Sequence, residues 1–227
     1  MKKKTRCIHY FKNFDLNIQL NSQKITQIGE NREELSFKLL GIEMDHNLKF
    51  NHHISTLKNK LKRYLFGLRR VKNQIDFFGR KTYFTSFIQS IINYGAVIWG
   101  TKATKTQLTT LEKLYKQGLR LMVNKKYKRH TADICKRNKI LNFEKLINRQ
   151  IGTQAFKHIK TGRIEMLSSS RLQDAKMTRI PNNRGGSKSI LVCESSLWNN
   201  LPLVIKQCQT DMIFKHELKM YLIECIE

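Results

Sequence analysis

The stretch ISTLKNKLKRYLFGLRRVK, residues 54–72, decides the fold class of this chain. Its apolar residues recur every three or four positions, which is the spacing of one buried stripe along an α-helix. The other positions are crowded with lysine and arginine, and residues 52–75 contain no acidic residue. The stretch therefore predicts an amphipathic helix with an apolar inner face and a cationic outer face. The members of the apolar stripe are Ile54, Leu57, Leu61, Leu65, Leu68 and Val71.

Helical spacing of apolar residues continues toward the C-terminus. It predicts further helices at about 80–94, 106–122 and 143–159, and a terminal helix around 213–222. Thr106 is the candidate N-cap of the second of these, without a capping box. Trp99 and Trp198 are expected to be buried core residues. Helices joined by short polar links indicate a bundle.

Residues 14–44 follow a different period. Leu16, Ile18 and Leu20 alternate with polar residues, and a second apolar segment runs from Phe37 to Met44. Alternation with a period of two, bounded by Asn, Ser and Gly, predicts an antiparallel hairpin with a third strand.

The expected fold class is therefore α+β and mostly α. A small antiparallel hairpin or three-stranded sheet is expected in residues 1–50, and a basic helical bundle in residues 51–163. The Ser-, Asn- and Gly-rich stretch 164–190 is expected to be a linker or loop, and 191–227 a C-terminal segment that ends in a helix.

The positive charge is concentrated in one block of the sequence. The chain has 43 Lys and Arg against 17 Asp and Glu, a net charge of +26, and residues 51–163 alone carry 26 basic and 4 acidic residues. Such a field repels itself in a compact state unless a polyanion neutralises it. Nucleic acid is the leading candidate polyanion, because covering phosphates releases condensed counterions. An anionic membrane surface is the competing one, and some ribosomal and chromatin proteins share this composition.

Two groups of residues are the candidate nucleic-acid contacts. The first lies on the amphipathic helix, and its alternative interpretation is a solvated helix face. The second is a short basic cluster whose tyrosine could stack on a base, and its alternative interpretation is a basic linker. The first group is Lys58, Lys60, Lys62, Arg63, Arg69, Arg70 and Lys72, and the second is Lys125, Lys126, Tyr127, Lys128 and Arg129.

Other site types find little support in the sequence. The five cysteines are widely spaced without a CxxC pair, which argues against a disulfide framework or zinc ribbon and suits a reducing compartment. His46, His52 and His53 have no cysteine or carboxylate support as metal ligands. The six aspartates stand singly, so no two-metal site is visible and no metal is expected. With no membrane-spanning run and no signal-peptide pattern, a cytoplasmic or nuclear location without a membrane partner is expected.

Several short motifs occur along the chain in a fixed order. Together they resemble the post-catalytic half of reverse transcriptases from non-LTR (LINE-type, jockey-like) retrotransposons. That family's pattern runs F-L-G-x-x-x-D-x-x-L-x-W-x-x-H-I, then a basic helix and Y-G-x-x-x-W-G, and closes with W-N-x-L-P and F-K-x-x-L-K-x-Y-L. The matching residues here are Phe37 to Asp45 with Leu48, Phe50, His53 and Ile54, then Leu68 to Arg70, Tyr94 to Gly100, Leu111 to Lys113, Leu197 to Pro202, and Phe214 to Leu222.

The resemblance implies where the chain lies within such an enzyme. Lys4-Thr5 resembles the K-T box of motif D, so the chain would begin inside the palm, with Lys4 as a candidate general acid toward the leaving pyrophosphate. Residues 52–100 would form the thumb that holds the template–primer duplex. Residues of a primer-grip-like hairpin would be Leu39, Leu40, Gly41 and Asp45.

The departures from the family pattern limit the implied activity. The catalytic aspartates that hold Mg²⁺ in the full-length family enzyme belong upstream of motif D and are absent here, so whether this chain counts as an enzyme stays open. Phe50 stands where the family usually has Trp, and Leu40 where it usually has an aromatic residue.

The resemblance therefore implies a C-terminal fragment of an RNA-directed DNA polymerase. It would bind RNA, DNA or an RNA–DNA hybrid, hold no cofactor itself and not polymerise alone, with another chain as a possible source of the missing palm. The alternative is a non-enzymatic basic helical RNA-binding protein without polymerase ancestry. A basic amphipathic membrane-surface protein is the third and least favoured interpretation.

Overall fold

A computed structural model describes most of the helical part of the chain and several short strands. The described residues are 19–20, 23–24, 36–45, 48–124, 130–162, 166–167, 176–177 and 189–227. They belong to two compact units, Met1–Thr56 and Leu57–Glu227, and each unit is described by itself. The expected site residues Lys4 and 125–129 lie outside the described residues.

The first unit contains short antiparallel strand pairs. β1 (Gln19–Leu20) pairs with β2 (Gln23–Lys24), and β3 (Ser36–Leu39) pairs with β4 (Ile42–Asp45). Each pair is a separate sheet, so the described residues of this unit form no three-stranded sheet.

The expected strand over Phe37 to Met44 is in fact a hairpin of its own. Leu40 and Gly41 have φ angles of 46° and 83°, and positive φ at both central residues is the geometry of a type I′ turn. Gly41 adopts this conformation without steric cost, and the chain therefore reverses direction in the middle of the apolar segment.

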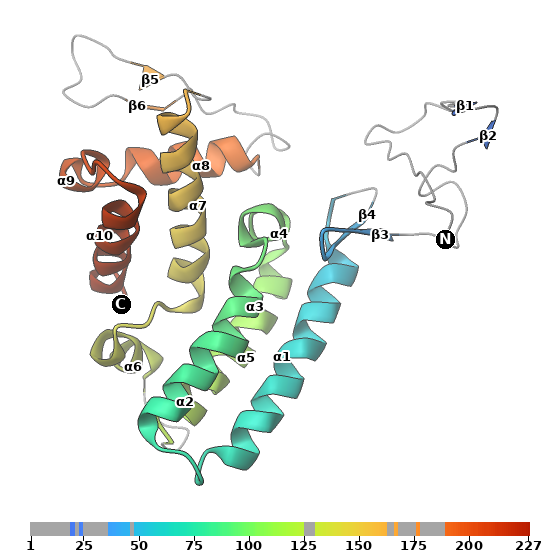
Figure 1. Cartoon of the computed structure of the whole chain (residues 1–227), viewed down its shortest axis with the longest axis vertical. Helices are drawn as coiled ribbons and strands as arrows, with labels where there is room; N and C mark the ends of the chain where they lie inside the picture. Colours follow the sequence, from blue (N-terminus) through green and yellow to red (C-terminus); the bar gives the residue numbers. More distant parts are fainter. Residues whose placement is uncertain are drawn as a thin grey trace. The chain divides into compact units, whose positions relative to one another are not determined.

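The second unit is helical, and Figure 1 shows the order of its elements. α1 (Asn51–Val71) enters it from the first unit. A continuous run follows, made of α2 (Phe77–Tyr83), the π-helical segment η1 (Phe84–Gln89) and α3 (Ser90–Asn93). The remaining elements are α4 (Ala96–Lys102), α5 (Lys105–Met122), α6 (Thr131–Asn138), α7 (Phe143–Lys160), β5 (Met166–Leu167) paired with β6 (Lys176–Met177), α8 (Ile190–Asn199), α9 (Leu203–Lys206) and α10 (Asp211–Glu224). The predicted α+β, mostly α class is confirmed.

α1, η1 and α5 share one part of the core. Leu65 and Leu68 of α1, Phe84 and Ile88 of η1, and Leu119 of α5 are all at most 3% exposed. The three elements pack closely around Gly118 of α5, where a Cβ would lie 2.9 Å from Phe84 Cε2 and 3.2 Å from both Ile88 Cδ1 and Leu65 Cδ2. A glycine is needed at this position because any side chain would separate the three elements.

α7 organises the other part of the core, because it contacts α4, α8 and α10. The Phe156 ring of α7 stacks on Phe214 of α10 with centroids 4.1 Å apart, and Trp198 of α8 lies 6.0 Å from Phe214. Trp198 and Trp99 are both buried, as predicted. Residues 191–227 therefore pack within the same unit as α7.

Side-chain caps fix where several helices begin. Asp76, Asn142 and Thr210 accept backbone N–H groups at the starts of α2, α7 and α10. For α5 the predicted cap Thr106 is wrong. Thr104 is the N-cap and forms a capping box, in which Gln107 N–H donates to Thr104 Oγ1 (3.3 Å) and Thr104 N–H donates to Gln107 Oε1 (2.8 Å). None of the helices described is long and apolar enough to cross a membrane.

Candidate nucleic-acid interface

The outer side of α1 carries a set of exposed cations. Burial of the predicted apolar stripe directs the remaining positions of the helix to solvent, with Leu61 and Leu68 at 0% exposure. We call the exposed cations the α1 cationic face. Its members are Lys60, Lys62, Arg63, Arg69 and Arg70. Of the other predicted contacts on this segment, Lys58 is half-buried, and half-buried Lys72 lies in the turn beyond the helix end.

The α1 cationic face has no local counter-charge. α1 contains no acidic residue, so no i,i+4 ion pair can form along it. Within the described ranges, no carboxylate lies within 4.0 Å of the charged group of any of its five members. Arg69 and Arg70 also lie in the last turn, where a cation stabilises the negative end of the helix dipole. The interaction with the helix dipole gives a structural role to Arg69 and Arg70 at most. The charges of Lys60, Lys62 and Arg63 remain available to an external anion.

An exposed aromatic ring lies among these cations. Phe66 is 59% exposed, and the Arg70 guanidinium carbon lies 5.8 Å from the centre of its ring. Arg63, Phe66 and Arg70 are three and four positions apart, so they share one side of the helix. An apolar ring between two guanidinium groups offers a stacking surface for a base beside contacts for phosphates.

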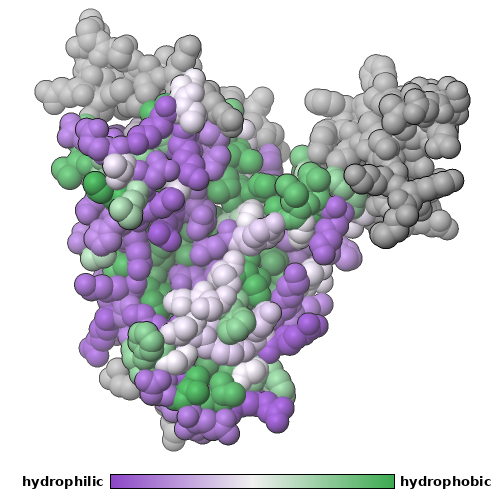
Figure 2. Space-filling view, viewed as in Figure 1, coloured by the Kyte–Doolittle hydropathy of each residue, from purple (hydrophilic) through white to green (hydrophobic). Residues whose placement is uncertain are grey.

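The surface next to α1 is uncharged. Residues 82–101, which cover η1 and α3, include no charged residue. Phe87 of η1 is 43% exposed and stacks on Tyr64 of α1, with ring centroids 5.3 Å apart and 20° between the planes. Tyr83 reinforces this contact, because its hydroxyl donates to the Tyr64 carbonyl (3.1 Å). In Figure 2 the α2–α3 run forms a pale, weakly polar band across this face.

One nearby arginine has a structural role. The Arg80 guanidinium donates to the backbone carbonyls of Met122 (2.9 Å), Lys72 (2.8 Å) and Ile75 (2.5 Å). It thereby ties the turn after α1 to the start of α2 and the end of α5. The sequence does not distinguish this arginine from the solvent-facing ones, since only its partially buried surroundings show its role.

The hairpin expected to resemble a primer grip leads directly into α1. Leu39, Leu40 and Gly41 are exposed at its tip. The Asp45 carboxylate accepts the N–H groups of Lys49 (2.7 Å) and Asn51 (3.3 Å), so it is engaged at the start of the helix.

Glu43 was not singled out from the sequence, yet its carboxylate makes two contacts with α1. It pairs with His52 Nδ1 at 2.7 Å and accepts the Thr56 hydroxyl at 3.1 Å. Together with Asp45 it connects the hairpin to the first residues of α1, all within the first unit. Across the described parts of the chain, no group of three or more His, Cys, Asp and Glu side chains is placed to hold a metal ion.

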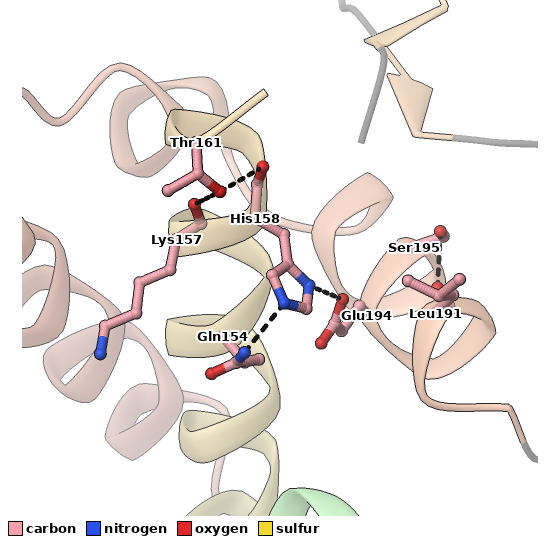
Figure 3. A network of polar contacts seen from close by, with 7 residues as sticks. All are labelled: Gln154, Lys157, His158, Thr161, Leu191, Glu194 and Ser195. Atoms are coloured by element: carbon pink, nitrogen blue, oxygen red, sulfur yellow. Dashed lines mark hydrogen bonds and ion pairs between the residues drawn. The ribbon is translucent and has the colours of Figure 1, made fainter. Parts of the chain in front are cut away.

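A buried hydrogen bond between a histidine and a carboxyl group joins α7 to α8 (Figure 3). His158 Nδ1 lies 2.8 Å from Glu194 Oε2, and the Glu194 side chain is 0% exposed. Burial raises the pKa of Glu194, while the hydrogen bond and charge of His158 oppose the rise. The neighbouring Ser195 hydroxyl donates to the Leu191 carbonyl (2.7 Å). The pair therefore fastens two helices together, and its only sequence signal is a lone acid in an apolar helix.

A groove of about 800 Å³ lies among α4, α5, α7 and α8. Apolar side chains such as Leu108, Ile147 and Leu197 line much of it, with Glu112 and Glu144 among its polar residues. These carboxylates belong to different helices and form no metal-binding group with other described residues. The α1 cationic face, with five exposed charges of one sign, is therefore the stronger candidate for a binding site than this groove.

Comparison with protein-family models, with curated proteins and with solved structures finds no match to this chain.

Proposed function

We propose that this chain binds the phosphate backbone of a nucleic-acid duplex through the α1 cationic face, as the C-terminal, non-catalytic part of a non-LTR reverse transcriptase. The observation that carries the proposal is the exposure of five cations on one helix that contains no acid. Solvated helix faces usually mix charges of both signs, which favours solubility.

The helix geometry supports backbone contact rather than base-specific recognition. A helix of 21 residues is about 30 Å long at 1.5 Å per residue. Flexible lysine and arginine side chains distributed along it can follow successive phosphates. Such contacts position a duplex but carry no sequence information. Because the surface beside α1 is uncharged, the nucleic-acid backbone can approach it without removing water from further charged side chains.

The reverse-transcriptase part of the proposal depends on the order of the sequence motifs and on the concentration of charge in residues 51–163. In that family the thumb holds the template–primer duplex, which is the role the α1 cationic face would perform. Because the metal-holding aspartates are absent from the sequence, we expect the chain to hold a duplex without extending it.

Salt-dependent binding tests the duplex contact. Fluorescence anisotropy with an RNA–DNA hybrid of about 20 base pairs measures the association constant K at several salt concentrations. A plot of log K against log salt concentration has a negative slope, and its magnitude decreases by about 0.9 for each phosphate that the protein no longer neutralises. We expect R63E/R70E to reduce the slope by roughly 1.8. The control K105E/K113E makes the same charge change at exposed lysines of α5 and should leave the slope nearly unchanged. An unchanged slope for R63E/R70E, or an equal reduction for both variants, would contradict the proposal.

Primer extension tests the assignment to a reverse transcriptase fragment. With Mg²⁺, dNTPs and an annealed primer, the purified chain should incorporate no nucleotide, and clear incorporation would refute the assignment to a non-catalytic fragment. A preference for a hybrid with a recessed 3′ end over hairpin RNA would support the polymerase ancestry. Equal or tighter binding to hairpin RNA would favour the non-enzymatic RNA-binding alternative.

A further inference from the structure

Exposed aromatic side chains are concentrated beside the α1 cationic face. Among the described residues, every aromatic side chain that is exposed belongs to α1, to the α2–α3 run or to the residue directly after that run. Single exposed apolar residues need no explanation, whereas a group of them on one surface indicates a binding partner. The exposed aromatic residues are Phe66, Phe77, Phe78, Phe87 and Tyr94.

Three rings meet between α1 and the α2–α3 run, which lie side by side in Figure 1. Phe87 stacks on Tyr64 with ring centroids 5.3 Å apart and 20° between the planes. The Tyr83 ring lies 4.7 Å from that of Phe87. We call Tyr64, Tyr83 and Phe87 the three-ring cluster.

Two contacts hold the three-ring cluster in place. The Tyr83 hydroxyl donates to the Tyr64 carbonyl (3.1 Å). This approach requires glycine at position 67 of α1, because a Cβ there would lie 2.6 Å from the Tyr83 hydroxyl oxygen. Rings that are already ordered lose little conformational freedom when a ligand stacks on them. Phe87 also belongs to the π-helical segment η1, and such turns are frequent at functional sites.

Phe87 is only partly used by the fold. Its neighbours Phe84 and Ile88 in η1 are 0% exposed, whereas Phe87 is 43% exposed although it stacks on Tyr64. Cations of the α1 cationic face border the cluster, because exposed Lys60 lies one helical turn before Tyr64 and exposed Arg63 directly before it. Residues 82–101 on the other side carry no charge. The open ring therefore lies between a phosphate-binding surface and an uncharged one.

We propose that the three-ring cluster stacks on an unpaired base next to the duplex that the α1 cationic face binds. The inference rests on the proposed function, because the bordering phosphates belong to that ligand. A base has a flat, uncharged face and a phosphate on either side of its sugar, which matches an open ring beside cations. Paired bases show a protein only their edges in the grooves, so the ligand is a nucleotide of a single-stranded extension. An apolar protein segment would also cover the ring, but it gives the bordering cations no role.

An RNA–DNA hybrid with a single-stranded extension tests the site. The extension consists of about five nucleotides, and a matched hybrid has an abasic extension that keeps the phosphates and lacks the bases. We expect the wild type to bind the extension with bases about tenfold more tightly than the abasic one, at low and at high salt, because stacking does not depend on phosphate charge. Equal affinity for the two extensions would overturn the proposal.

Variants of Phe87 assign this preference to the cluster. F87L keeps an apolar side chain beside Tyr64 without a ring and should lose the preference, whereas F87W supplies a larger ring and should retain it. The control M212A removes an apolar side chain that is 79% exposed on α10 and should behave as the wild type does. A preference that persists in F87L would contradict the assignment.

Photocrosslinking of the wild type provides the same test if F87L fails to fold. A hybrid with 5-iodouridine in the extension should crosslink to a ring of the three-ring cluster, and crosslinks confined to other residues would overturn the proposal. The proposed function fails separately. An unchanged salt slope for R63E/R70E contradicts the duplex contact, whereas equal binding of the extensions with and without bases contradicts the stacking site alone.

Discussion

Gly118→Ala tests whether α1 docks against η1 and α5 in the way that turns its cations outward. The added methyl group would lie 2.9 Å from Phe84 Cε2 and 3.2 Å from Ile88 Cδ1 and Leu65 Cδ2, which is closer than carbon atoms normally pack. All three neighbouring side chains are at most 3% exposed, so none can move into solvent to make room. The helices themselves must therefore separate.

Two opposing effects set the size of the change. Overpacking of a close-packed core costs about 1–3 kcal/mol. Replacing glycine by alanine inside a helix stabilises by up to about 1 kcal/mol. Because three buried side chains contact the methyl group, we expect the clash to prevail, with a net loss of about 1–2 kcal/mol in the free energy of unfolding.

Urea denaturation measures this loss as a lower midpoint at an unchanged m-value. The control Lys113→Ala, at an exposed position of α5, should change the free energy of unfolding by less than about 0.5 kcal/mol. Phe84→Leu removes the ring atom nearest the new methyl group, so G118A/F84L should lose less stability than the two single variants together. A Gly118→Ala protein as stable as the wild type, or strictly additive losses, would refute the packing described here.

Three further outcomes are expected in urea denaturation. Arg80→Lys should cost about 1–3 kcal/mol, because an ammonium cannot reproduce the guanidinium's three backbone hydrogen bonds. Tyr115→Phe should cost about 1–2 kcal/mol, because it removes a buried hydroxyl that donates to the Leu141 carbonyl (2.7 Å). Burial raises the pKa of Glu194 above its ordinary 4.5, so its contribution to stability is complete below pH 4.5 and is lost as the pH rises through the raised pKa. Glu194→Gln should therefore flatten the decline in the free energy of unfolding as the pH rises above 4.5, and an unchanged decline would contradict the burial of this carboxylate.

The long helices could be predicted because each has a strong apolar stripe. α1, α5 and α7 span 21, 18 and 18 residues, which is enough for the period to repeat several times. The short helices α4 and α6 have seven and eight residues, so no period could establish them. α4 also follows a left-handed Gly95 (φ 62°), which the sequence presents only as a turn residue.

The missed features depend on contacts between residues far apart in the sequence. The pairing of His158 with Glu194, 36 residues apart, requires α8 to pack on α7 before either residue has a partner. The donation of Arg80 to the Met122 carbonyl crosses 42 residues in the same way. The apolar pattern alone predicted a single strand over 37–44, because a run of apolar residues gives no sign of the two-residue turn at Leu40 and Gly41.

Net charge alone could not separate the roles that these cations have in the structure. Arg80 is satisfied by three carbonyl groups and belongs to the fold, so its removal should reduce stability whether or not a ligand is present. The α1 cationic face is exposed and has no carboxylate partner among the described residues, so its removal should change binding and alter stability only slightly. These two different outcomes show that the partner of each cation, rather than the total charge of +26, decides what each part of the surface does.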